Sequence, residues 1–116
     1  MTFSVPSPWD VIVVPFPYSE QLAEKRRPAL VVSSEALASE GFLWVVMITG
    51  AGKQLRAGDI AVASLAVASL PGPSMIRTSK LATIEPSRVL RIVGRLADPE
   101  RTRVAKSIAE FLAKAT

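Results

Sequence analysis

Residues 10–33 read DVIVVPFPYSEQLAEKRRPALVVS. The two ends of this stretch, DVIVVPF at residues 10–16 and PALVVS at residues 28–33, are short and rich in β-branched residues, which is typical of buried strands. Pro15 and Pro17 close the first of them. The polar middle, residues 18–27, has no helical stripe and indicates a loop or an irregular hairpin connection. This stretch therefore predicts a mainly β protein.

The pattern of short strands continues outward from this stretch. Residues 42–49, FLWVVMIT, are the most apolar segment and predict a central strand with Trp44 in the core. The run IAVASLAVASL after Asp59 indicates a strand followed by a turn. Residues 74–78, 81–84 and 89–93 predict further strands, with turns at residues 79–80 and 85–87. So many short strands predict a small closed or half-closed barrel.

Two helices are expected beside these strands. Ser34 precedes EALASEG, where a serine cap and a terminating Gly41 indicate one or two helical turns. Near the C-terminus we expect a helix with Asp98 as its N-cap and Pro99 at its first position. Its apolar face should pack on the barrel and consists of Val104, Ile108, Phe111 and Leu112.

Length and composition favour one folded domain. The 116 residues, 49% hydrophobic and 21% charged, suffice for one core. We assign the domain to residues 9–116 and an irregular arm to residues 1–8, which carry no Lys or Arg and do not resemble a signal peptide. The longest apolar run, residues 42–48, is too short to span a membrane, so no membrane partner is expected.

The charge points to an anionic partner. The net charge is +4, and nine of the fourteen basic residues are arginine, whose planar fork matches phosphate oxygens. The chain has no cysteine and no histidine. This excludes disulfides, thiol nucleophiles, Cys/His zinc sites and histidine acid–base pairs, and it is compatible with a reducing cytoplasm.

The order of these motifs resembles the MazF/PemK toxin family. WDVIVVPF and RRPALVVS within residues 9–33 are similar to that family's first two strands, and VVMITGAGK and SMIRTSKLATIEPSRVLRIVGRL continue the similarity past residue 8 to the closing helix. The resemblance implies an SH3-like β-barrel with a C-terminal α-helix, a two-fold homodimer and an RNA groove across the dimer interface. It also implies a cofactor-free and metal-free endoribonuclease that leaves 2′,3′-cyclic phosphate and 5′-OH ends, and an antitoxin whose flexible segment occupies the groove.

The resemblance also assigns roles to individual residues. Arg27 matches the arginine at the scissile phosphate, and Thr49 matches the threonine or serine beside it. Arg77 matches an arginine that serves as general acid in PemK-type members. The aspartate that can serve as base there is replaced by Ser79, which cannot take a proton unaided near neutral pH. The family's opening glycine, a turn residue, is replaced by Trp9.

This chemistry needs neither histidine nor metal, because RNA carries its own nucleophile in the 2′-OH. Arg27 and Arg77 are the candidates for stabilising the phosphorane charge, and Thr49 for donating a hydrogen bond to a phosphate oxygen or fixing the Arg27 rotamer. For the base we favour Glu20, in the loop before the arginines, over Asp10 and Ser79. Glu20 has a second interpretation as an exposed loop acid.

Further residues are candidates for holding RNA. We predict RNA contacts at Ser19, Lys25, Arg26, Lys53, Ser79 and Lys80, with Arg56 as a further loop cation and Tyr18 as the best stacking residue. A solvated charge run is the other interpretation of residues 25–27, and solvation of a barrel strand is the other interpretation of Arg88, Arg91 and Arg95.

Two alternatives to the nuclease remain open. One is a non-catalytic toxin of the same superfamily that binds DNA gyrase, as CcdB proteins do, and Ser79 in place of an aspartate favours it. The other is a small basic barrel that only binds RNA.

Overall fold

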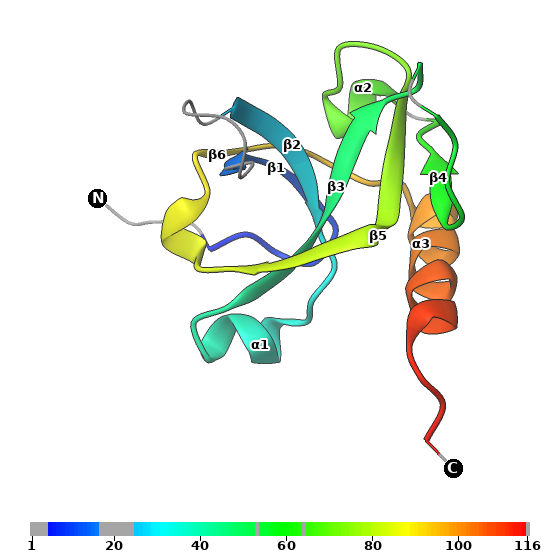
Figure 1. The fold of residues 1–116 in the computed structure, drawn as a ribbon. Coiled ribbons are helices and arrows are strands. Elements are labelled where there is room, and N and C mark those ends of the chain that lie inside the picture. Colours follow the sequence, from blue (N-terminus) through cyan, green and yellow to red (C-terminus); the bar gives the residue numbers. More distant parts are fainter. Residues whose placement is uncertain (1–4, 17–24, 53, 64, 116) are drawn as a thin grey trace.

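The computed structural model describes residues 5–16, 25–52, 54–63 and 65–115. Within them an antiparallel sheet has the strand order β4-β5-β3-β2-β1-β6, and helix α3 stands beside β4 and β5 (Figure 1). The mainly β, barrel-like fold with a C-terminal helix is confirmed. In the described part of the chain the edge strands β4 and β6 do not pair, so the sheet is half-closed. The elements are β1 (Asp10–Phe16), β2 (Lys25–Val31), α1 (Glu35–Ser39), β3 (Leu43–Gly50), β4 (Asp59–Ala61), α2 (Leu65–Ala68), β5 (Ser74–Ile84), η1 (Pro86–Arg88), β6 (Arg91–Arg95) and α3 (Asp98–Phe111).

Strand β2 begins before the predicted start at residue 28. Val14 of β1 pairs with Arg27, and Pro15 pairs with Arg26, so the basic residues belong to the hairpin and not to its loop. The prediction of a loop is therefore wrong for residues 25–27. These residues are polar, yet they form part of a strand because they pair with β1, which is rich in β-branched residues.

Strand β5 is continuous from Ser74 to Ile84, so the predicted turn at residues 79–80 is wrong. Its register against β3 shifts between Val46, which faces Leu81, and Met47, which faces Arg77. The extra residues are taken up by this irregularity, which acts as a bulge and bends the strand. The polar pair at 79–80 therefore marks a bend within one strand.

The strand predicted after Asp59 is shorter than expected, and a short helix follows it. β4 keeps only Asp59–Ala61 of the strand expected after Asp59, and α2 follows it. The last strand begins at Arg91, after η1, and not at residue 89. Helix α2 packs against β6 at Gly94, where an added Cβ would lie 2.5 Å from the carbonyl carbon of Ala68. Gly94 thus permits this close approach.

The sheet carries a hydrophobic cluster on each face, as alternation along its strands requires. On one face Val11, Leu30, Val46, Ile48 and Ile76 pack with residues of α2 and α3, among them Ala68 and Val104. On the other face the sheet curls over Ile12, Val14, Ala29, Val31, Leu43 and Val45. This curl makes the fold barrel-like.

Helix α3 matches the expected helix and buries the first half of the expected apolar stripe. Its N-cap is Ala97, one residue before the predicted Asp98. Val104 is buried and Ile108 packs against the same core cluster, as predicted. Phe111 and Leu112 are 53% and 66% exposed, so the prediction is wrong for Leu112, while the Phe111 ring lies beside Gly58 and is only partly covered. The buried side is also partly polar. Ala63 N donates to Glu100 Oε2 (2.8 Å), and the Ser107 hydroxyl lies 2.8 Å from that of Thr78.

Trp44 is not a core residue, contrary to the prediction from its apolar neighbours. Its side chain is 46% exposed, while Leu43 and Val45 beside it are buried. Trp44 lines a surface pocket with Val32, just after β2, and Leu37 of α1. Within the described residues, no helix is long and apolar enough to cross a membrane.

Candidate active site

Arg27 and Thr49 are brought together at one end of the sheet. Ala29 of β2 faces Met47 of β3, and continuing this antiparallel register by two residues brings Arg27 opposite Thr49. Both line a pocket of about 340 Å³, together with Arg26, Gly50 and the segment from Leu70 to Ser74. Residues on two strands that are separated by helix α1 in the sequence thus share one concave site.

The Arg27 side chain is partly enclosed by the structure. Its Nε atom is buried, while the residue as a whole is half-buried. Thr49, at the end of β3, is also half-buried and precedes the exposed Gly50. A guanidinium and a hydroxyl at the mouth of a pocket can both donate to one phosphate group.

Arg77 lies deeper and is bound by an acid that the sequence analysis did not single out. Arg77 Nε donates to Asp59 Oδ1 (3.2 Å), and its Nη2 donates to Asp59 Oδ2 (3.0 Å) and to the carbonyl oxygen of Gln54 (2.7 Å). The side chains of Arg77 and Asp59 are 9% and 0% exposed. This bidentate ion pair joins β5 to β4 and to the segment before β4.

The environment of Asp59 keeps it ionised. Burial alone would raise the pKa of this carboxyl, but the hydrogen bonds from the Arg77 side chain and the Arg56 backbone N–H, with the positive charges of both arginines, outweigh it and lower the pKa below its usual value. The only signal in the sequence was an acid directly before a predicted strand. Without the register of β4 on β5, its pairing with Arg77 was not visible.

The other predicted site residues lie in several places. Arg26 is exposed and lines the pocket with Arg27. Ser79 and Lys80 are exposed on β5 and do not line that pocket. Lys25 belongs to β2, but its side chain, like Ser19, Glu20, Tyr18 and Lys53 as a whole, lies outside the described residues.

Asp10 is engaged elsewhere. Its Oδ2 accepts from the Ser7 N–H (2.8 Å), and its Oδ1 lies 3.4 Å from Arg95 Nε. The carboxyl is buried and ties the segment before β1 to β6. These contacts give Asp10 a structural role.

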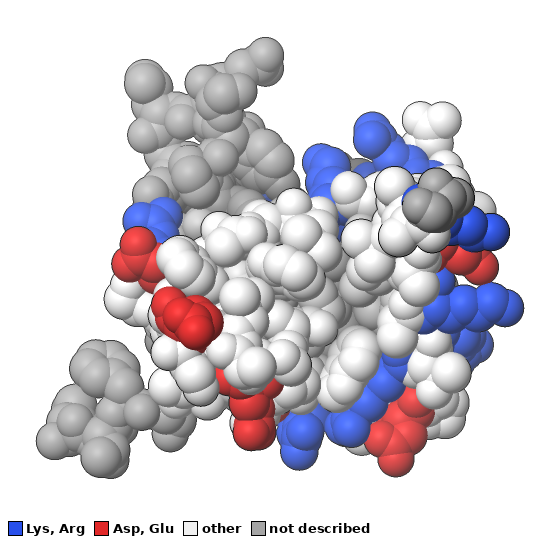
Figure 2. Space-filling model, turned by 90° about the horizontal axis from the view of Figure 1, so that it is seen from below, with Lys and Arg blue, Asp and Glu red and all other residues white. Residues whose placement is uncertain are grey.

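Charge is unevenly distributed over the surface. On the face shown in Figure 2, Lys and Arg side chains gather mainly along one side, and the central area is largely uncharged. Among the described residues, no group of three or more acidic side chains could hold a metal ion.

The fold and the pocket define a small antiparallel barrel protein with an arginine-lined site, and comparisons identify its family. Residues 7–112 match the family of PemK-like, MazF-like toxins of type II toxin-antitoxin systems. Because this match covers nearly the whole chain, the protein belongs to that family.

Solved structures agree in fold at low sequence identity. The Mycobacterium tuberculosis toxin MazF-mt6 is 22% identical, with a TM-score of 0.70 over 87% of this chain and 93% of its own. MazF from Deinococcus radiodurans is 17% identical, with a TM-score of 0.74 over 93% and 96%. An endoribonuclease in complex with its cognate antitoxin, from a mycobacterial species, is 15% identical, with a TM-score of 0.71 over 90% and 92%. No curated protein sequence matches the chain.

Proposed function

We propose that this toxin is an endoribonuclease that cleaves single-stranded RNA and leaves 2′,3′-cyclic phosphate and 5′-OH ends. The observation that carries the proposal is the shared pocket of Arg27 and Thr49. An endoribonuclease activity is also ascribed to structural neighbours of the same fold.

The pocket offers the groups that such a cleavage needs most. As the 2′-OH attacks the adjacent phosphorus, negative charge builds on the non-bridging oxygens, and the Arg27 guanidinium stabilises it. Thr49 donates a hydrogen bond to the same phosphate or holds Arg27 in place. The attack breaks the P–O5′ bond, so the 2′-OH must also lose its proton and the leaving 5′ oxygen must gain one, and neither Arg27 nor Thr49 is assigned these two transfers.

For Arg77 we propose a positioning role. Two of its nitrogens are used by Asp59 and by the Gln54 carbonyl, and the side chain is almost fully buried. These contacts favour a guanidinium that holds the segment before β4 in place over one that transfers a proton. Its earlier assignment as general acid stays a prediction, as does that of Glu20 as base.

The partners are part of the proposal. We propose a homodimer that acts in the cytoplasm and is inhibited by a cognate antitoxin lying in the RNA groove. A complex with an antitoxin is known for a structural neighbour of the same fold. No cofactor enters the proposed reaction.

The test is cleavage of a long defined RNA in excess EDTA, with mapping of the new ends. Wild type should cut at a restricted set of sequences. Arg27→Ala should cut more slowly by roughly a hundredfold or more, and Thr49→Val, which keeps the shape but removes the hydroxyl, by a smaller factor. Arg103→Ala, an exposed position on α3, is the matched control.

Two outcomes would contradict the proposal. If the wild-type protein leaves the RNA intact, the nuclease proposal is wrong. The alternatives are then a toxin that acts by binding and a barrel that only binds RNA. Cleavage that requires magnesium keeps the activity but removes the metal-free mechanism.

A further inference from the structure

A second basic pocket adjoins the one that holds Arg27 and Thr49. It has a volume of about 400 Å³ and shares Arg26, Arg27 and Pro28 with the first pocket. The remaining described residues that line it are Val13, Leu90 and Arg91. An RNA strand bound in the first pocket can therefore continue into the second without leaving the protein surface.

The strand register places two arginines across an apolar floor. Val13 of β1 faces Pro28 on β2 and Arg91 on β6, and directly paired residues share a face of the sheet. Arg26, two residues before Pro28, lies on the same face. The backbones of β2 and β6 are separated here by β1 alone, or about 10 Å at the usual strand spacing of roughly 4.8 Å. Both guanidinium groups can reach one anion between them.

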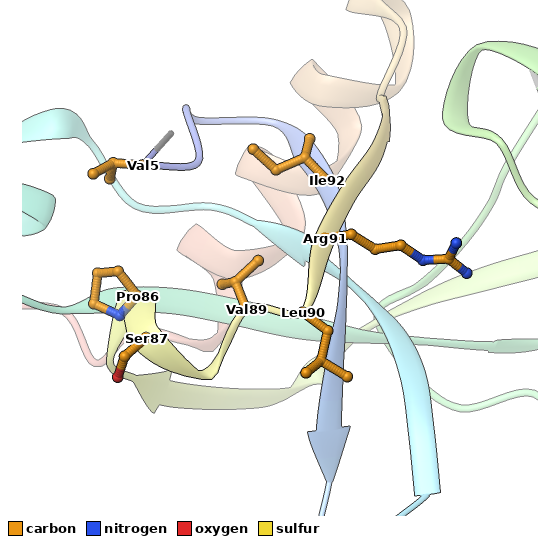
Figure 3. A pocket seen from close by; sticks show the side chains of 7 residues that line it. All are labelled: Val5, Pro86, Ser87, Val89, Leu90, Arg91 and Ile92. Atoms are coloured by element: carbon orange, nitrogen blue, oxygen red, sulfur yellow. The ribbon is translucent and has the colours of Figure 1, made fainter. Parts of the chain in front are cut away.

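Arg91 has no described partner that would explain its position. It is exposed, and within the described residues it makes no hydrogen bond or ion pair. Its neighbour Arg95, by contrast, is held by Asp10, and Arg101 by Asp98 and the Leu96 carbonyl. Figure 3 shows the Arg91 side chain pointing away from Ile92 and Val89.

The charge of this second pocket is of one sign. None of its described lining residues is acidic, and three of them are arginines. Arginine pairs with phosphate oxygens through parallel N–H donors, and an exposed cation without a carboxylate partner retains that capacity. The apolar floor of Val13, Pro28 and Leu90 leaves room for a sugar or base beside the phosphate.

We propose that Arg91 and Arg26 form a phosphate-binding subsite for the RNA backbone next to the scissile nucleotide. This inference rests on the proposed RNA-cleaving function and adds a residue of β6 to the substrate site. The subsite holds the chain in register and takes no part in bond breaking. Its loss should weaken RNA binding and raise KM with little change in kcat, because a flanking phosphate is held equally in the ground and transition states.

The test compares Arg91→Gln with Arg103→Gln, which removes the same charge from an exposed position on α3 that lines neither pocket. The probe is a fluorescent single-stranded oligonucleotide of mixed sequence with every 2′-OH methylated, which binds but cannot be cut. Its affinity is measured at several salt concentrations. Each phosphate contact contributes a slope of roughly 0.7 in log K against log salt for single strands. Arg91→Gln should lower the slope by about that amount, and Arg103→Gln should leave it unchanged.

Each outcome separates this inference from the proposed function. Equal slopes for wild type and Arg91→Gln overturn the subsite even where the wild type cuts RNA. A lower slope for Arg91→Gln supports the subsite even where no RNA is cut, although the nuclease is then lost. A wild type that does not bind the probe overturns both. An Arg91→Gln variant that binds the probe normally but an acidic antitoxin poorly reassigns this surface to the protein partner. Equal thermal unfolding of the variants checks that the fold is intact.

Discussion

Trp9 occupies a backbone position that favours glycine. Its φ angle is 71°, in the left-handed region, where a Cβ costs roughly 1–2 kcal/mol relative to glycine. The N–H of Trp9 donates to the Val31 carbonyl, and its ring packs against the cluster of Val11 and Leu30. Packing of the indole therefore offsets the strain of the turn.

At position 9, a glycine variant should be more stable than an alanine variant, the reverse of the usual order of stability. Both Trp9→Gly and Trp9→Ala lose the packing of the ring, but only glycine also relieves the positive φ. We expect Trp9→Gly to be more stable than Trp9→Ala by about 1 kcal/mol, as measured by urea unfolding. An alanine variant that is equally or more stable would show that the turn relaxes without strain.

Replacing only one partner of the Asp59–Arg77 ion pair should destabilise the protein strongly. Replacing both partners by apolar residues should be tolerated much better. Asp59→Leu leaves a buried guanidinium without its carboxylate, for which we expect a loss of about 3 kcal/mol of unfolding free energy. The double variant Asp59→Leu/Arg77→Met replaces both charges by apolar groups and should be clearly more stable than the single variant. A loss below about 1 kcal/mol for Asp59→Leu would mean that water reaches the pair.

The same pair predicts a pH dependence. Because the folded state lowers the pKa of Asp59 below its usual value of 3.8, the pair contributes stability above that pH. The contribution is lost as the pH falls from there through the lower pKa of the folded state. Asp59→Asn should remove this part of the acid destabilisation, which unfolding free energies measured along a pH series would reveal.

At the scale of elements, strands with polar sequences form because of their pairing and packing partners, which the local sequence does not reveal. Apolar runs predicted β1 and β3 closely, because strands buried on both faces read as continuous β-branched segments. The basic start of β2 and the polar bend of β5 were missed, because both are held by partners distant in sequence. The same limit concealed Asp59, whose role depends on β4 facing Arg77 across the sheet.

Helix α2 and strand β6 depend on the absence of a side chain at Gly94. An added Cβ there would lie 2.5 Å from the Ala68 carbonyl carbon, a backbone atom that cannot rotate away. We expect Gly94→Ala to destabilise the protein by about 2 kcal/mol through overpacking. Gly52→Ala, where nothing lies within 4 Å, is the control in the same thermal unfolding experiment. Equal stability of the two variants would mean that α2 shifts freely.

At the scale of the whole molecule, the motifs single out residues whose surroundings only the fold defines. Arg27 and Thr49 were predicted from motifs and share a pocket, since both lie at the same end of paired strands. Arg77 was predicted from the same motifs, but its surroundings are set by β4, a three-residue strand that carries almost no pattern. Arg91 could not be separated from an ordinary solvated strand residue until the register placed it beside Val13.

The family also predicts how the folded toxin responds to its antitoxin. A partner that binds only the folded state stabilises it by about 2.7 kcal/mol at a free concentration a hundredfold above Kd. Addition of the cognate antitoxin should therefore raise Tm and, if it covers the pocket of Arg27 and Thr49, abolish RNA cleavage at equal stoichiometry. The Arg27→Ala variant separates the two effects, because it should cut RNA poorly and still gain thermal stability. An antitoxin that raises Tm of the wild type but leaves cleavage intact would place its binding surface away from this pocket.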